Sequence, residues 1–475
     1  HSYSRTYITP LALKMAKDSR VLVLSRSTVK ASVALAAAPR VVAVSNLDLL
    51  PQSIPNSLFC AYRRPNAGGG FRDVVAAFEA SLPSLLDHFL PLTGRIVADP
   101  RSGRPELLHC DNQGAELVLG EVGVALASLN YGNLGASLAE IGVPVQYDAA
   151  VALSVQLVSF ACGGFAVAWA SNHMLLDGYS LCMLANAWSE LARSGSVSAA
   201  PNHDRSVFRP RAPPSYSPSL GEAFTALKEE HLVNALTTES SFVQRTYYVE
   251  ARDLEKLRAQ ASRSRADGEA TRLEALSAYL WKALAAVVGS SDKSCRMGWW
   301  VDGRRRLTAL RFKAVMRNYV GNVTTFAVAE ASVEGLRGRP LPDIASAVRE
   351  SIRSKATDEH FQQLVDWVEE HRAAKYVETA TVGLGSPVLA VTAFTSFSFD
   401  TDFGFGRAAL VLPTSKDGAR LCDGFVQIIA RPGGGDWLLT MYVWPRLAAA
   451  LDNDERRIFK PLTADYIGLN QYSRL

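Results

Sequence analysis

Hydrophobic and polar positions along the chain alternate between the period of a strand and that of an amphipathic helix, with no internal repeat. Apolar residues recur at helical spacing in five segments, which predicts helices that bury one face: residues 71–90, 178–193, 273–288, 344–356 and 361–377. Short β-branched or aromatic runs bounded by polar residues predict strands: residues 21–24, 40–44, 151–160, 165–170, 241–249, 323–329, 388–399, 425–430 and 437–444.

A stretch rich in proline and serine divides this pattern. Residues 195–220 have no apolar period, which predicts an extended crossover or linker. We therefore expect two α/β domains of similar size, one over residues 15–194 and one over residues 221–475. Residues 1–14, which precede Met15, are left out of the fold prediction.

Composition and charge exclude several classes of protein. The chain has 475 residues, 48% of them hydrophobic, with a formal net charge of +4. This excludes a disordered chain, and the small, evenly spread charge argues against partners such as nucleic acid or a membrane surface. The six cysteines form no CxxC pair, so no metal site is expected. With no run of the ~18–20 apolar residues of a membrane span and no secretory signal, we expect a cytoplasmic protein.

His173 and Asp177 are the first candidates for chemistry. They lie in the segment Asn172–Gly178, after a predicted buried strand and before a predicted helix. A strand that ends there delivers a side chain into a cleft, where an imidazole could take a proton from a hydroxyl or an amine. The spacing also fits Asp177 as the N-cap of a helix that begins at Gly178, with His173 an ordinary loop residue. Spacing alone favours this second interpretation.

Residues 402–406, Asp-Phe-Gly-Phe-Gly, form a second candidate segment. Two glycines interleaved with two aromatic residues predict a tight turn held by buried rings. The segment does not fit the GxGxxG motif of dinucleotide-binding proteins. We therefore expect Asp402, Gly404 and Gly406 to maintain structure and to do no chemistry themselves.

A third candidate is the arginine cluster in residues 301–307, Val-Asp-Gly-Arg-Arg-Arg-Leu. Three arginines could bind a phosphate or a carboxylate, or they could form a solvated run of charge. One of them could also point inward and pair with a buried aspartate, and Arg304 is the candidate for that position.

Two classes of hydrolase are disfavoured by motifs that the chain lacks. It has no G-x-S-x-G segment, which argues against a Ser-His-Asp hydrolase. It also has no H-E-x-x-H segment, which excludes a zinc protease of that type.

Together, the segments resemble the plant BAHD acyltransferases. In that family an HxxxD motif precedes a DFGWG motif, as His173–Gly178 precedes residues 402–406 here. Shorter segments also resemble the family, in the same order: Ser45–Asp48, Leu90–Arg95, Ser277–Lys282, Val301–Arg306 and Asn318–Asn322. These matching motifs in register overturn the interpretation of His173 as an ordinary loop residue.

The resemblance implies an α/β fold of two domains like chloramphenicol acetyltransferase, each a mixed sheet flanked by helices, joined by a long crossover. It implies acyl-CoA as a co-substrate with no bound cofactor, an alcohol, phenol or amine as the acceptor, and a cytosolic monomer. His173 would remove the proton of the acceptor as it attacks the thioester. Because both substrates are held together, no covalent acyl-enzyme is needed.

Family analogy also assigns roles to the residues around His173. Asp177 would point away from the substrate, pair with an arginine and shape the loop that positions His173. Two departures from the family stand out. Phe405 replaces the tryptophan of DFGWG, and Phe397 follows Thr395-Ser396 where many relatives have Thr-Ser-Trp. Phe397 has no N–H to donate to an oxyanion, so Thr395 would carry more of that stabilisation.

The substrate is less closely defined than the reaction. Val320 and the phenylalanine-rich residues 394–405 favour an aromatic acyl group, such as hydroxycinnamoyl, or a long one over malonyl. No feature separates O- from N-acylation. A second hypothesis is a non-catalytic relative that assists fatty-acyl elongation, and a third is a condensation enzyme, whose HHxxxDG motif has Asn172 in place of its first histidine here.

Overall fold

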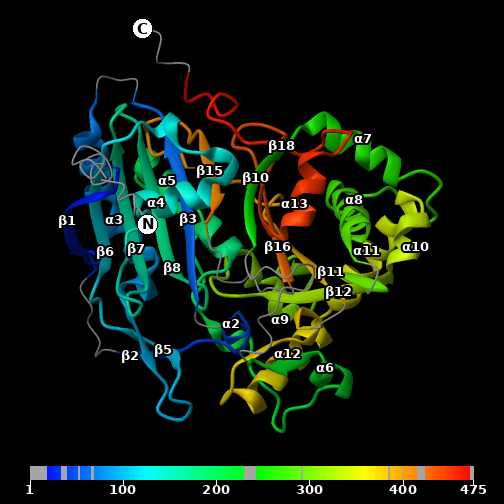
Figure 1. The fold of residues 1–475 in the computed structure, drawn as a ribbon. Helices are drawn as coiled ribbons and strands as arrows, with labels where there is room; N and C mark the ends of the chain where they lie inside the picture. Colours follow the sequence, from blue (N-terminus) through cyan, green and yellow to red (C-terminus); the bar gives the residue numbers. More distant parts are fainter. Residues whose placement is uncertain are drawn as a thin grey trace, which may run out of the picture.

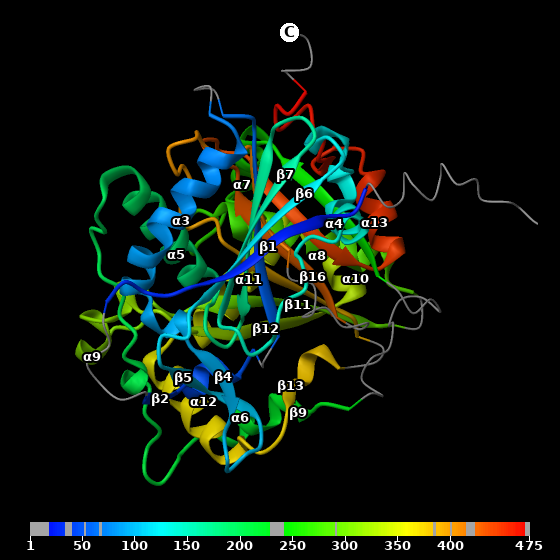
Figure 2. The same ribbon diagram turned by 90° about the vertical axis from the view of Figure 1, so that its left-hand side faces the viewer.

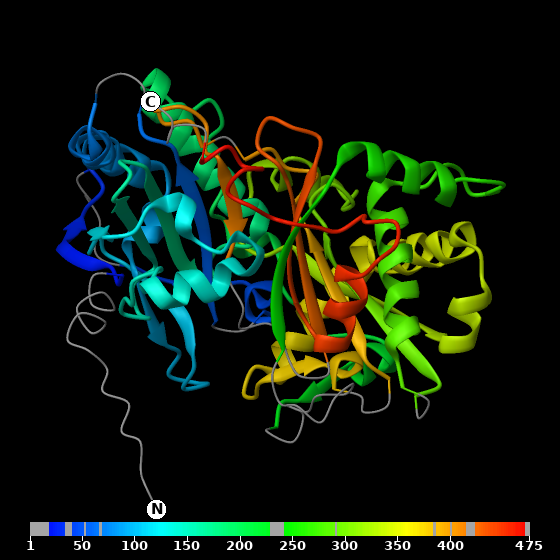
Figure 3. The same ribbon diagram turned by 45° about the horizontal axis from the view of Figure 1, so that its top comes forward.

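Two large β-sheets stand side by side, each packed against its own helices (Figures 1 and 3). The computed structural model describes residues 19–33, 40–51, 54–65, 69–228, 242–289, 292–382, 386–399, 401–414 and 423–470. The excluded N-terminal segment, Met15 and Cys422 lie outside the described residues.

The first sheet has six strands, and helices cover both of its faces. Helices α3 (Phe71–His88) and α5 (Gly178–Ser194) lie together on one face, and α4 (Leu134–Ile141) lies on the other (Figure 2). The strand β8 is buried at all of its positions, because it lies inside the sheet under these helices. The strand order is β1 (Leu22–Val29), β6 (Ala115–Val122), β7 (Leu153–Phe160), β8 (Phe165–Asn172), β3 (Pro55–Tyr62) and β15 (Leu410–Pro413).

The second sheet has seven strands and mixed directions. Its core is shared with the helices α7 (Ala251–Ala261), α8 (Arg272–Val287), α10 (Val333–Gly338), α11 (Leu341–Lys355) and α13 (Pro445–Asp452). The strand order is β12 (Thr324–Ser332), β11 (Ser294–Asp302), β14 (Val388–Ala393), β16 (Asp423–Ala430), β17 (Trp437–Val443), β10 (Val243–Val249) and β18 (Lys460–Pro461).

Smaller elements form a third, separate core below the two sheets. Helix α12 (Asp358–His371) packs against α2 (Asn46–Leu49) and α6 (Pro218–Glu222), with Phe361 and Trp367 buried between them. Apart from short 3-10 helices, the other elements of the described residues are α9 (Leu310–Lys313), a three-stranded sheet of β2 (Arg40–Ala43), β5 (Pro105–Cys110) and β4 (Arg95–Ala98), and a pair formed by β13 (Tyr376–Glu378) and β9 (Phe224–Ala226).

Most of the predicted helices and strands are present, but two were predicted too long. The helix predicted over 361–377 ends at His371, and Tyr376–Glu378 form strand β13. The strand predicted over 388–399 ends at Ala393, because the chain leaves the sheet and turns at residues 395–396. The alternating phenylalanines beyond Ala393 therefore do not continue a strand.

The residues after that turn return to the first sheet. Strand β15 pairs with β3, although it belongs to the predicted C-terminal part, residues 221–475. The predicted crossover, residues 195–220, contains a 3-10 turn at Arg205–Val207, an isolated β-bridge from Asn202 to Tyr319 and the start of α6. The two sheets are therefore not two separate stretches of chain, and the domain boundaries themselves stay a prediction.

The Asp-Phe-Gly-Phe-Gly segment is the turn that precedes β15. The carboxylate of Asp402 accepts hydrogen bonds from the backbone N–H groups of Gly404 and Gly406. Both glycines have positive φ, 96° and 94°, which other residues adopt only with strain. The Phe403 ring is buried and lies 4.9 Å from Phe78, with Tyr62, Trp169 and Trp188 also in ring contact.

We predict that Phe403→Ala lowers the free energy of unfolding by about 3–5 kcal/mol, because it empties a site inside this aromatic cluster. Phe405 is only partly buried, so Phe405→Ala serves as the matched control and is expected to cost less than half as much. Thermal or denaturant unfolding of the two variants measures the difference. Equal losses would contradict the role of Phe403 as the anchor of the turn.

Candidate active site

His173 lies at the end of a buried strand, as the sequence predicts. Strand β8 ends at Asn172, and the backbone N–H of His173 donates to the carbonyl of Ile54 at 2.9 Å. The next three side chains, Met174 to Leu176, are buried in the core of the first sheet. They anchor the loop, while the His173 side chain remains partly exposed.

Asp177 caps helix α5 and also pairs with Arg304. Its Oδ1 accepts from the backbone N–H of Ser180 at 2.9 Å, which confirms the N-cap interpretation. Its Oδ2 lies 2.7 Å from Nη1 of Arg304, which confirms Arg304 as the inward arginine. The backbone N–H of Val323 also donates to Oδ2, at 3.2 Å. These donors hold the carboxylate of Asp177.

Arg304 is buried, and its hydrogen bonds reach both halves of the chain. Besides Asp177, it donates to Asp302 at 3.0 Å and to the carbonyl of Gly321 at 2.7 Å. The guanidinium also lies over the ring of Tyr179, 4.6 Å from its centroid. Burial alone would lower the pKa of Arg304, but the two carboxylates raise it above the ordinary arginine value. The arginine therefore stays charged.

The imidazole of His173 is held by Asn322, a residue of the second half of the chain. Nδ1 of His173 lies 3.1 Å from Oδ1 of Asn322. Burial lowers the pKa of His173 below its usual 6.5, although the charge of Asp177, hydrogen bonds to the His173 backbone and to Asn322, and the charge of Asp48 act in the opposite direction. His173 is therefore neutral at pH 7 and can accept a proton.

Asp48 and Arg205 lie behind Asn322. Oδ1 of Asp48 accepts from the backbone N–H of Asn322 at 2.7 Å, and Oδ2 accepts from Nε of Arg205 at 2.9 Å. All three side chains are buried. They come from α2, from the crossover and from the loop before β12, so the surroundings of His173 are built from distant parts of the chain.

Gly178, the first residue of α5, allows the residue after β14 to pack closely against the start of the helix. A Cβ at Gly178 would collide with the ring of Phe394. Thr395 follows Phe394 in the turn after β14. Within the part of the chain that the structure describes, the Thr395 hydroxyl makes no hydrogen bond. The ring of Phe397 packs edge-on against Tyr179, 5.2 Å away.

The structural residues Asp402, Gly404 and Gly406 do not join this group. The hydroxyl of Ser189 donates to the carbonyl of Asp402 at 2.8 Å. Ser189 is three turns of α5 beyond Gly178, or about 16 Å at 1.5 Å per residue. The turn therefore braces the far part of the helix whose first turn carries the Asp177 cap.

The sequence did not single out three residues of this group by their chemistry. Asn322 and Asp48 entered only as parts of short segments that resemble a family, and Arg205 only as part of the crossover. A polar residue in a short apolar segment, such as Asp48 between Leu47 and Leu49, is the signal that could have pointed to them.

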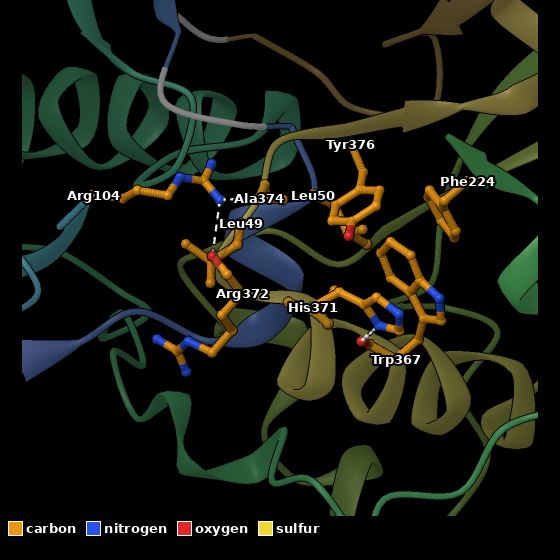
Figure 4. A pocket seen from close by; sticks show the side chains of 10 residues that line it. Leu49, Leu50, Arg104, Phe224, Trp367, His371, Arg372, Ala374 and Tyr376 are labelled. Carbon is orange, nitrogen blue, oxygen red and sulfur yellow. Dashed lines mark hydrogen bonds between the residues drawn. The ribbon is translucent and has the colours of Figure 1, made fainter. Parts of the chain in front are cut away.

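A small pocket lies away from His173, between α12 and β13 (Figure 4). Its cavity of about 30 Å³ holds one or two water molecules at most. The ring of Trp367 stacks on Phe224 at 4.2 Å and on His371 at 4.3 Å, so aromatic side chains fill most of the space. Leu49 of its lining follows Asp48 in α2, but neither His173 nor Asn322 lines the pocket.

The described residues offer neither a membrane-spanning helix nor a cluster of metal ligands. No helix there is long and apolar enough to cross a bilayer. In the same described ranges, no group of three His, Cys, Asp or Glu side chains could hold a metal ion.

Comparison with known proteins finds relatives over most of the chain. An omega-hydroxypalmitate O-feruloyl transferase of Arabidopsis thaliana is 26% identical over 387 residues, covering 78% of this chain and 80% of the relative. A putrescine hydroxycinnamoyltransferase of Oryza sativa subsp. japonica is 27% identical, covering 83% of this chain and 90% of the relative.

Solved structures confirm the expected fold class. Vinorine synthase superposes with a TM-score of 0.70 at 19% identity, over 93% of this chain and 99% of the other. TRI101 of F. graminearum, in complex with coenzyme A and T-2 mycotoxin, superposes with a TM-score of 0.72 at 13% identity, over 89% of this chain and 99% of the other. Residues 19–441 match the Transferase family profile. The chain belongs to this Transferase family, the family of the plant BAHD acyltransferases that its motifs resemble.

Proposed function

We propose that this protein transfers an acyl group from acyl-CoA to a hydroxyl or amine of a small plant metabolite, with His173 as the general base. The observation that carries the proposal is the state of His173. The imidazole is neutral at pH 7 and partly exposed at the end of a buried strand, and its Nδ1 is engaged by Asn322. Nε2 is then the ring atom available to a substrate.

The reaction needs no group beyond the two substrates and the protein. Nε2 of His173 takes the proton of the acceptor O–H or N–H as that oxygen or nitrogen attacks the thioester carbonyl carbon. A tetrahedral oxyanion forms, and the C–S bond breaks when it collapses. The imidazolium then returns the proton to the departing thiolate, which leaves as free CoA. Holding both substrates together supplies the orientation.

The oxyanion needs a hydrogen-bond donor, and Thr395 is our candidate. Its hydroxyl is uncommitted among the described residues, and it lies in the turn next to Phe394, which packs on Gly178. Phe397 has no polar hydrogen to offer. In other enzymes the loss of one oxyanion donor costs about 2.7–4 kcal/mol of transition-state stabilisation.

For the donor substrate we favour a hydroxycinnamoyl or other aromatic acyl-CoA. The names of the relatives support this class, since they include feruloyl, caffeoyl and hydroxycinnamoyl transferases. Their named acceptors include a hydroxy fatty acid, a fatty alcohol and the amine putrescine, so both O- and N-acylation belong to the proposal. We also propose that the protein works as a monomer in the cytoplasm, with neither a metal nor a bound cofactor.

The direct test is acceptor-dependent release of free CoA by the purified protein. The donors are acetyl-, malonyl-, benzoyl-, p-coumaroyl-, feruloyl- and long-chain acyl-CoA, each offered with pooled alcohols, phenols and amines. We expect release with the aromatic donors, and a fall in kcat of about 10²–10⁴-fold in His173→Ala, because the general base is lost.

His109→Ala is the matched control, since this partly exposed histidine lies on β5, outside the site. It is expected to turn over like the unmodified protein. Activity in His173→Ala equal to that of His109→Ala would contradict the mechanism. No release with any donor, from protein that still unfolds cooperatively, would favour the non-catalytic relative that assists fatty-acyl elongation.

The pH dependence of kcat/KM follows from the pKa of His173. Burial lowers that pKa below the usual 6.5, so the neutral, active form persists to lower pH than in a free histidine. We predict that kcat/KM falls toward acidic pH as Nε2 becomes protonated, with its half-maximal value below pH 6.5. A half-maximal value above pH 6.5 in the pH–rate profile would contradict this.

We assign Asp177 to positioning, with no proton transfer of its own. Asp177→Ala removes a helix cap and leaves the buried Arg304 without its main partner, which typically costs about 3–5 kcal/mol. We predict that activity and thermal stability fall together in this variant. An Asp177→Ala protein that is inactive but melts like the unmodified protein would show that Asp177 acts chemically.

A further inference from the structure

Two buried carboxylates lie near His173, and only one of them is linked to its imidazole. The oxygens of Asp177 are taken up by Arg304 and by backbone N–H groups. Oδ1 of Asp48 accepts from Asn322, which in turn contacts Nδ1 of His173. The hydrogen-bonded path from His173 to a carboxylate therefore runs through Asn322 to Asp48.

The orientation of the Asn322 amide is fixed by its other partners. Nδ2 of Asn322 lies 2.8 Å from the carbonyl oxygen of His173 and 3.0 Å from Oδ1 of Asp48. Both of these atoms accept hydrogen bonds and have none to donate, so the atom that faces them must be the NH₂ group. Oδ1 of Asn322 must then face the imidazole of His173.

This orientation determines which nitrogen of His173 carries the proton. Oδ1 of Asn322 can only accept, so Nδ1 of a neutral His173 must be the N–H, and Nε2 keeps its lone pair. We propose that Asn322 is a positioning residue that holds His173 in the Nδ1–H tautomer, and that Asp48 in turn orients Asn322. This inference rests on the proposed function, in which Nε2 is the base.

Asp48 is itself held in place by a charge. Its Oδ2 accepts from Nε of Arg205 and from the backbone N–H of Ser45 at 2.8 Å. Its Oδ1 accepts hydrogen bonds from the backbone N–H and from the side-chain NH₂ of Asn322. Both oxygens of Asp48 therefore face hydrogen-bond donors, and a carboxylate can accept from all of them. An amide at this position would turn its NH₂ group toward the donors on one side.

The test is the tautomer of His173 in Asn322→Ala, measured by ¹⁵N NMR of protein labelled on histidine. The chain has eight histidines, and His173→Gln identifies the signal. We expect a shift from Nδ1–H toward Nε2–H, together with a loss in kcat of about 10²–10⁴-fold; the upper figure is the loss when a triad histidine adopts the wrong tautomer. The KM for acyl-CoA should change less than twofold.

Asn56→Ala is the matched control. Asn56 is also a buried asparagine, and it binds the same loop through the carbonyl of Leu176, at 2.9 Å. Its loss should lower stability and leave the His173 tautomer unchanged. An Nδ1–H tautomer that persists in Asn322→Ala, or an equal shift in Asn56→Ala, would overturn the proposal.

Asp48→Asn tests whether Asp48 orients Asn322. If Asn322→Ala does not fold, this variant tests the proposed control of the His173 tautomer in its place. The charge of Arg205 will draw the oxygen of the new amide, which turns its NH₂ toward Asn322 and disfavours the present orientation of that residue. We expect a mixture of the two tautomers. Because the NMR signal needs no substrate, it tests the positioning role even if no acyl transfer is found, and the two proposals can fail separately.

Discussion

The burial of Arg304 is the constraint on which the rest of the site depends. A charged guanidinium inside a protein costs several kcal/mol unless it is paired and its hydrogen bonds are made. Here its partners come from both halves of the chain: Asp177 at the start of α5, Asp302 at the end of β11 and the carbonyl of Gly321. Meeting all of them fixes the first half against the second. Because Gly321 precedes Asn322, the same contacts also place the residue that holds His173.

Packing on the far side of α5 supports this arrangement. The helix carries the Asp177 cap at its first turn and the ring of Trp188 near its other end, where Trp188 meets Phe403. The turn that holds Phe403 and the strand β15 after it return to the first sheet from a distant part of the sequence. The position of α5, and with it the loop of His173, is therefore set by contacts at both ends of the helix. This explains how a turn that contacts α5 about 16 Å along the helix from Gly178 can belong to the same set of motifs.

The period of the apolar residues predicted the helices and strands well wherever an element buries one of its faces. It failed where the chain left an element without a change in composition. The phenylalanines after Ala393 continue the alternation of β14, but the chain turns there to reach Gly178. In the site, the HxxxD spacing identified His173 and Asp177. Asn322 and Asp48 are 274 positions apart in sequence, and no periodicity or spacing rule connects residues at that distance. Only the fold brings them together.

Asp177 and Asp48 have different roles around His173, and both are compatible with a neutral imidazole. A free carboxylate beside a histidine raises the pKa of the imidazole and keeps it protonated. Asp177 is four positions from His173, yet the pKa of His173 is lowered, because burial outweighs the charge. The pairing of Asp177 with Arg304 makes this balance possible, since the guanidinium offsets the negative charge close to where it arises. The charge of Asp48 also favours the protonated ring, but its hydrogen-bonded link to the imidazole runs through the neutral amide of Asn322, which orients the ring. The ion pair thus holds the carboxylate of Asp177, and burial keeps the imidazole of His173 neutral at pH 7.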